Sequence, residues 1–255
     1  MAPRPRAAGA SGEPAAGAAG SAPRPAERPG GLRGGRLGVF LSAYYSAARF
    51  LAGAALGLLT RWEVKGREQV PREGGLIVAS NHVSFWDPPL VGAALPREAH
   101  FLAKEELFSS PWMGWIIRSV NAIPIRRGVA DLSGMSRAIE RVKRGSALLM
   151  FPEGSRMRDG ELHPARPGVG MMAVNADVPI VPCYVSGSGR PGRWLWRGVR
   201  VRIWFGPALH WKDLAGPETD LAPGRALYQR VSDAVMREIA VLRSGQLRSA
   251  SRGAA

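Results

Sequence analysis

The sequence predicts an α/β fold, a single domain with a mostly parallel sheet flanked by helices and preceded by an N-terminal membrane-interacting helical segment. Short apolar runs of strand length alternate with helical patterns from Trp62 onward. Such alternation is typical of parallel sheets with helical crossovers. A long apolar stretch, residues 37–59, precedes the first strand candidate.

The composition divides the chain into four parts. Residues 1–36 consist almost entirely of Ala, Gly, Pro, Arg and Ser. Such a segment cannot bury enough apolar surface to offset the entropy lost on ordering, so it is predicted to be a disordered basic tail. Residues 37–60 form a predicted membrane-associating helical segment, 61–245 the folded domain and 246–255 a second disordered tail.

The apolar stretch 37–59 is long enough to cross a bilayer, which takes about 20 apolar residues. Arg49 lies in its middle, however, and a central arginine costs about 2.5–3.5 kcal/mol of insertion free energy. We therefore expect a helix that lies in the membrane interface. A true membrane span and a buried core helix remain open alternatives.

The elements of the domain follow from apolar patterns and turn residues. Strands are expected at 75–80, 100–104, 122–125, 147–151, 179–185 and 199–205, the last as an edge strand because its apolar residues alternate. Asp87, followed by two prolines, is predicted to cap a helix that runs through Leu95. Further helices are expected near 111–119, at 131–144 and at 228–242.

The balance of charges indicates an anionic partner. The formal net charge is +15, with arginine as the main contributor. Nucleic acid, an anionic membrane surface and phosphorylated substrates all fit such a balance. Cys183 is the single cysteine, which leaves no disulfide framework and no cysteine metal cluster and favours a reducing compartment.

Candidate catalytic residues follow the strand expected at 75–80. His82 and Asp87 lie in the polar turn at its end. A neutral imidazole can accept a proton near neutral pH, and a nearby carboxylate can fix its tautomer and stabilise the imidazolium. The nucleophile in such a scheme can be a hydroxyl of the substrate. A purely structural histidine and a helix-capping Asp87 remain the alternative readings.

A second polar turn follows the strand expected at 147–151. Gly154 would let a substrate approach the backbone closely, and N–H groups there could bind an anion. Arg156 adds positive charge, and Arg126 and Arg127 end another short strand. Paired arginines can bind phosphate in bidentate fashion. An ordinary surface turn and a solvated basic edge are the alternatives.

Four segments occur in the order and at the intervals of a known family. They read NHVSFWD at 81–87, NAIPIRRG at 121–128, FPEGSR at 151–156 and VPIVPC at 178–183. Together they resemble the four sequence blocks of the glycerolipid acyltransferases, in particular the 1-acylglycerol-3-phosphate acyltransferases. The resemblance covers residues 62–206 and identifies 61–245 as the acyltransferase domain.

The resemblance implies a role for each matching position. His82 would be the general base for the acceptor hydroxyl, and Asp87 its orienting partner. The acceptor would be bound by the residues that match the family's acceptor site, namely Lys104, Arg126, Arg127, Glu153, Gly154, Ser155 and Arg156. No metal and no cofactor is implied, because acyl-CoA or an acyl-carrier protein serves as co-substrate. Met157, Ala165 and Arg166 depart from the family pattern, which bears on the identity of the acceptor.

The implied function is transfer of a fatty acyl group to the free hydroxyl of lysophosphatidic acid, giving phosphatidic acid. The alternatives are transfer to another lysolipid or to an amino-acid-derived lipid, and a non-catalytic basic protein that binds lipid or nucleic acid. Arginines interleaved with tryptophans at 193–202 fit either surface. The apolar stretch 37–59 favours anionic membrane lipids as partners over nucleic acid. The expected location is the cytoplasmic face of a membrane, the bacterial inner membrane.

Overall fold

A computed structural model describes the structure of residues 53–55, 57–110, 117, 121–126, 132–190, 199–216 and 222–252. The predicted tail 1–36, most of the apolar segment 37–60, the helix expected near 111–119 apart from Ile117, and Arg127 lie outside these residues. Within the described part, residues 53–55 and 57–60 are helical. None of the helices in the described ranges combines the length and apolarity that a bilayer crossing requires.

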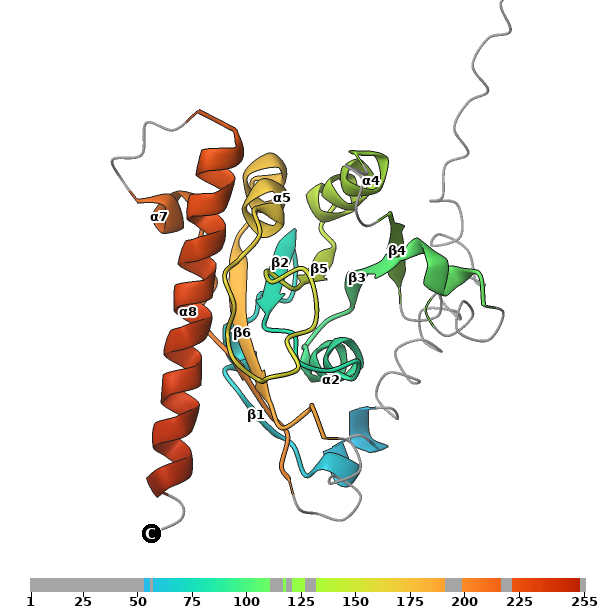
Figure 1. The fold of residues 1–255 in the computed structure, drawn as a ribbon. Helices are drawn as coiled ribbons and strands as arrows, with labels where there is room; N and C mark the ends of the chain where they lie inside the picture. The colour runs from blue at the N-terminus through green and yellow to red at the C-terminus, as the bar shows by residue number, and fades with distance from the viewer. Residues whose placement is uncertain are drawn as a thin grey trace, which may run out of the picture. The chain divides into compact units, whose positions relative to one another are not determined.

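The described residues form a sheet of seven strands (Figure 1). Its spatial order is β1-β7-β6-β2-β5-β3-β4, with β6, β2, β5, β3 and β4 parallel to one another and β7 antiparallel to β6. The strands are β1 (Glu63–Lys65), β2 (Leu76–Ser80), β3 (Ala99–Lys104), β4 (Ala122–Ile125), β5 (Ala147–Met150), β6 (Ile180–Ser186) and β7 (Arg202–Phe205). The mostly parallel sheet expected from the sequence is confirmed.

Helices cover both faces of the sheet. They are α2 (Asp87–Ala94), α4 (Leu132–Lys143), α5 (Gly168–Ala176), α7 (Trp211–Ala215) and α8 (Arg225–Arg252), with short 3-10 turns η1 (Arg67–Gln69) and η2 (Glu105–Phe108). Alternate residues of β2 face opposite ways: Ile77 and Ala79 pack with α4, α5 and α8, whereas Leu76 and Val78 pack with α2. This alternation is the reason that β2 is buried along its whole length.

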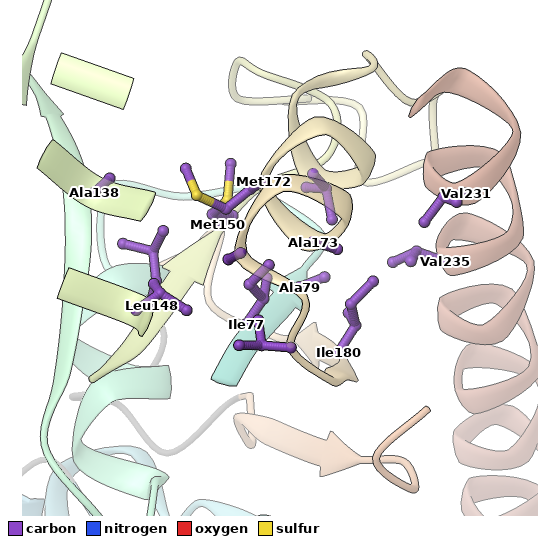
Figure 2. Close-up of a cluster of buried hydrophobic side chains, with 14 of the residues drawn as sticks. Ile77, Ala79, Ala138, Leu148, Met150, Met172, Ala173, Ile180, Val231 and Val235 are labelled. Atoms are coloured by element: carbon purple, nitrogen blue, oxygen red, sulfur yellow. The ribbon is translucent and has the colours of Figure 1, made fainter. Parts of the chain in front are cut away.

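Figure 2 shows the larger of the two cores. Met172 and Ala173 of α5 and Val231 and Val235 of α8 surround strand side chains such as Ile180. In Figure 1, α8 runs alongside α5 and β6, in agreement with their contacts. Because this core consists of apolar side chains, the polar candidate residues lie in the loops at the ends of the strands.

Several elements differ from the prediction. The strand expected at 199–205 is not at the edge of the sheet, because β1 pairs with β7 on its outer side. The sequence signals for β1, α5 and α7 were missed: β1 is short, and α5 is apolar except at the exposed Asn175, because it packs against the sheet, α4 and α8. α8 continues to Arg252 and thus includes most of 246–255, the stretch predicted as a disordered tail.

The candidate residues gather at one edge of the sheet. The carboxyl ends of parallel strands meet at the same edge, so the loops after β2, β5, β3 and β4 lie in that order along it. β7 and β1 run the opposite way, and their starts lie at this edge. We refer to it below as the carboxyl edge.

Candidate active site

Asn81 fixes the chain where β2 ends. Its side-chain Nδ2 donates to the carbonyl oxygen of Val185 at 3.0 Å, and its Oδ1 accepts from the backbone N–H of Val185 at 2.8 Å. The amide thus replaces a backbone pair and ties the end of β2 to β6. Because Asn81 is buried, this pair of bonds holds the start of the following turn in place.

His82 and Asp87 form a buried dyad in that turn. His82 Nδ1 lies 3.0 Å from Asp87 Oδ2, and the two residues are 8% and 0% exposed. The same Oδ2 accepts from the backbone N–H groups of Val83 and Ser84, both at 2.7 Å. A carboxylate oxygen can only accept, so the imidazole proton lies on Nδ1 and Nε2 keeps its lone pair. This is the tautomer that a general base requires.

Asp87 does not cap α2 as the sequence predicted. Asp87 is the first residue of α2, and Trp86 occupies the N-cap position without a side-chain cap. The carboxylate turns back toward Val83 and Ser84 instead of toward the helix N–H groups. Pro88 and Pro89 lack N–H groups, so the first turn of α2 needs fewer caps. The Asp87 carboxylate is therefore available to accept hydrogen bonds from the turn backbone and from His82.

Three residues of the loop after β5, Phe151, Glu153 and Met157, contact His82. The Phe151 ring stacks on the imidazole at a centroid distance of 4.0 Å. Glu153 Oε2 accepts from the backbone N–H of His82 at 2.8 Å, and the backbone N–H of Met157 donates to the carbonyl oxygen of His82 at 2.7 Å. The backbone of His82 is thus held on both sides by residues of the second polar turn.

The Glu153 side chain is buried, at 1% exposure, and its carboxylate accepts hydrogen bonds from backbone N–H groups. Its Oε1 accepts from the backbone N–H of His163 at 3.3 Å, while Oε2 binds His82. Burial raises the pKa of the Glu153 carboxyl, and the two N–H donors partly offset that rise. Glu153, predicted as an acceptor ligand, thus connects the turn after β2 to the loop after β5 through hydrogen bonds to the backbone of His82 and His163.

Gly154 needs its small size and its backbone freedom. It has φ 73°, and a Cβ there would lie 2.8 Å from Cδ of Arg166. Its N–H donates to the carbonyl oxygen of Phe151 at 3.0 Å, so it is not available to an anion as the sequence suggested. The glycine instead gives room to the Arg166 side chain next to the turn.

The basic candidates lie along the carboxyl edge at different strands. Lys104 ends β3 and pairs with Glu106 at 2.9 Å, while Arg126 follows β4 and pairs with Glu105 at 2.6 Å. The register of β3 and β4 sets Lys104 beside Ile125, so the two cations follow neighbouring strand ends. Ser155 and Arg156 follow Gly154, with Arg156 exposed to solvent. Arg127 lies outside the described residues.

Other chemistry is limited in the described part of the chain. No group of histidine, cysteine or acidic side chains there has the arrangement that a metal ion needs. Cys183 is fully buried, and burial raises the pKa of its thiol, which makes the thiolate scarce. It packs in the second apolar core.

Sequence reasoning missed four residues that shape the site. Phe151 looked like the last residue of a strand, and Asn81 like a turn residue. His163 contributes through its backbone N–H, which no pattern reveals, and Arg166 is brought beside Gly154 by the loop that closes over Pro152. The departure of Arg166 from the family pattern was the one available signal.

Known proteins similar to this chain are acyltransferases. A family model described as Acyltransferase matches residues 61–186. The 1-acyl-sn-glycerol-3-phosphate acyltransferase of Bacillus subtilis is 28% identical over 67% of this chain and 86% of its own length. The lyso-ornithine lipid O-acyltransferase of Pseudomonas aeruginosa is 34% identical, over 59% of this chain and 63% of that protein.

A solved structure shares the fold as well. The crystal structure of the 1-acyl-sn-glycerophosphate acyltransferase from Thermotoga maritima superposes with a TM-score of 0.57 at 26% identity, covering 81% of this chain and 88% of that one. The family match includes the dyad turn and the loop after β5. This chain is an acyltransferase and belongs to the glycerolipid acyltransferase family, which includes the 1-acyl-sn-glycerol-3-phosphate acyltransferases.

Proposed function

We propose that the protein transfers a fatty acyl group from a thioester donor to the free hydroxyl of lysophosphatidic acid, giving phosphatidic acid. The observation that carries this proposal is the His82–Asp87 dyad, whose hydrogen bonds leave Nε2 of the imidazole as the proton acceptor. The donor is acyl-CoA or an acyl-carrier protein, and no cofactor takes part. The predicted domain, 61–245, supplies the catalytic residues.

The reaction proceeds by direct transfer. His82 Nε2 takes the proton from the acceptor hydroxyl as that oxygen attacks the carbonyl carbon of the thioester. The carbon–sulfur bond then breaks, the new ester forms, and the departing thiolate takes the proton from the imidazolium. Asp87 stabilises the imidazolium while it exists. No acyl-enzyme intermediate forms, since the substrate hydroxyl is the nucleophile.

The buried Glu153 serves this reaction as a positioning residue. It lies beneath His82, and its two oxygens accept from the backbone of His82 and of His163. The carboxylate therefore sets where the imidazole lies relative to the loop after β5. We assign the acceptor phosphate to Arg156, which is exposed at the carboxyl edge, and to Arg127, whose role the sequence resemblance implies. Lys104, Arg126 and Ser155 are further candidate ligands.

The second candidate acceptor is a lysolipid derived from an amino acid. The lyso-ornithine lipid acyltransferase relative and the departures at Met157, Ala165 and Arg166 favour it. Arg166 lies against Gly154, within the turn that we assign to the acceptor. An acceptor with a different headgroup would contact this position.

An acyl-transfer assay tests the proposal. Several lysolipids are presented in vesicles with a labelled acyl-CoA, and the products are separated. We expect lysophosphatidic acid to be the best acceptor, with phosphatidic acid as the product. Preference for lyso-ornithine lipid would establish the second candidate, and no transfer to any lysolipid would contradict both. Fractionation of cells would test the proposed cytoplasmic face of the bacterial inner membrane.

A further inference from the structure

Exposed apolar side chains concentrate where the catalytic dyad lies. Phe85 and Trp86, which are 51% and 38% exposed, occupy the turn between His82 and Asp87. A pair of adjacent exposed aromatics is unusual on the surface of a soluble domain, since burial of such side chains is strongly favourable. Their position beside a buried dyad calls for a functional reason.

Further exposed leucines lie at the same edge of the sheet. Leu107 belongs to η2, which follows the carboxyl end of β3. Leu58 and Leu59 belong to the helical residues that lead into β1, and the start of β1 lies at the carboxyl edge. In the strand order β2 lies between β1 and β3. Along the edge, Phe85 and Trp86 therefore lie between Leu58 and Leu59 on one side and Leu107 on the other.

Hydrogen bonds within the turn hold the backbone that carries Phe85 and Trp86. Asp87 Oδ2 accepts from the backbone of Val83 and Ser84, and the hydroxyl of Ser84 accepts from the backbone N–H of Trp86 at 3.2 Å. These bonds fix the backbone of the turn, in which the side chains of Phe85 and Trp86 are exposed. The exposure of Phe85 and Trp86 is thus built into the catalytic geometry.

Cations accompany the apolar residues. Lys104, Arg156 and Arg126 are exposed at or after the ends of β3, β5 and β4, and Arg61 and Arg200 precede β1 and β7 at the same edge. Aromatic residues together with Lys and Arg are the composition that favours the headgroup layer of an anionic membrane. Glu105 and Glu106, which lie on this surface, are each paired with one of the cations.

We propose that Phe85 and Trp86, flanked by Leu107, Leu58 and Leu59, dock the catalytic edge of the sheet onto an anionic lipid surface. This inference rests on the proposed function, because it explains how a lipid acceptor reaches a histidine that is only 8% exposed. With the aromatic turn at headgroup depth, the acceptor hydroxyl can approach His82 while its acyl chain stays in the bilayer. Extraction of the whole acyl chain into water, which is unfavourable for every CH₂ group, is then avoided.

The chain offers a matched control. Val241 and Leu247 are 60% and 63% exposed on α8, an element separate from the dyad turn. The test compares Phe85→Ser/Trp86→Ser with Val241→Ser/Leu247→Ser in sedimentation with vesicles of phosphatidylcholine and phosphatidic acid, without donor. We expect the first pair to lower the partition coefficient by about 10-fold or more and the second pair to leave it unchanged. Phe85→Leu/Trp86→Leu, which keeps apolar side chains, should retain most of the binding.

Other outcomes would overturn the docking surface. Equal vesicle binding by the Phe85/Trp86 serine variant and the wild type, or equal loss in the α8 control, would show that the lipid contact lies elsewhere. A change in oligomeric state without a change in vesicle binding would assign the aromatics to a contact between two copies. Because the assay uses no donor and no acceptor turnover, a wrong acceptor assignment would leave its result intact.

Discussion

The Asp87→Asn variant tests the detailed geometry of the dyad. Asp87 Oδ2 accepts three hydrogen bonds, two of them from the backbone of Val83 and Ser84, whereas Oδ1 is buried without a partner in the described part of the chain. An asparagine amide in this position must place its oxygen toward the N–H groups, since its NH₂ would face three donors. That orientation keeps the proton on His82 Nδ1 and removes only the negative charge.

The expected effect follows from that argument. A hydrogen bond to a charged group contributes about 1.5–3 kcal/mol and a neutral one about 0.5–1.5 kcal/mol, a difference of about 1–2 kcal/mol in stabilising the imidazolium. We therefore expect kcat to fall by about 5–30-fold. Where the amide turns its NH₂ to the histidine and forces the wrong tautomer, the loss is about 10⁴-fold.

Single-turnover acyl transfer, with urea unfolding as a check on the fold, measures this effect. Asp87→Ala is the companion variant, because it leaves the His82 Nδ1–H and two backbone N–H groups unpaired. It should lower the free energy of unfolding by about 3 kcal/mol or more and abolish most activity. A loss near 10⁴-fold for Asp87→Asn in a folded protein would refute the orientation that the backbone donors impose.

Three further predictions concern Glu153 and Arg156. In Glu153→Gln the NH₂ group should point toward His163, where the hydrogen bond is the longer of the two. We therefore expect the free energy of unfolding to fall by about 1–2 kcal/mol and kcat to fall, with a nearly unchanged acceptor KM. A raised acceptor KM alone would instead make Glu153 an acceptor ligand. Burial raises the pKa of the Glu153 carboxyl above its ordinary value of 4.5, so between the unfolded and the native pKa the native state keeps a proton that the unfolded state has lost. The free energy of unfolding should therefore fall as pH rises through this range. Glu153→Gln should remove this pH dependence in urea titrations. Arg156→Ala should lower kcat/KM for lysophosphatidic acid by about 10–150-fold with little change in donor KM. Arg156→Lys should restore part of this kcat/KM. An equal loss of kcat/KM with a phosphate-free acceptor would exclude a phosphate contact.

The fold could be predicted from the sequence to the extent that its elements are periodic. The buried strands β2, β5 and β6 and the amphipathic helix α4 were each expected within one or two residues. α5 was missed because a helix that is apolar over most of its surface shows no distinct apolar stripe, and β1 because three residues with one hydrogen-bonded neighbour carry little pattern. The edge assignment of β7 depended on that missing strand.

The site was predicted in composition but not in contacts. The polar turn after β2 showed that His82 and Asp87 could meet, because both follow a buried strand. The orientation of Asp87 depends on backbone N–H groups, which every residue except proline has, so the sequence favoured a helix cap that the structure does not contain. Glu153 looked like a surface ligand, since no local pattern shows that its partners are the backbones of residues 82 and 163.

The central claim is that His82 is the general base of an acyl transfer to a substrate hydroxyl. The most direct measurement is the single-turnover rate of His82→Ala with labelled acyl-CoA and lysophosphatidic acid in vesicles, at equal thermal stability to the wild type. We expect a loss of about 10²–10⁴-fold in rate with donor and acceptor binding retained. A folded His82→Ala protein that transfers the acyl group at the wild-type rate would contradict the account.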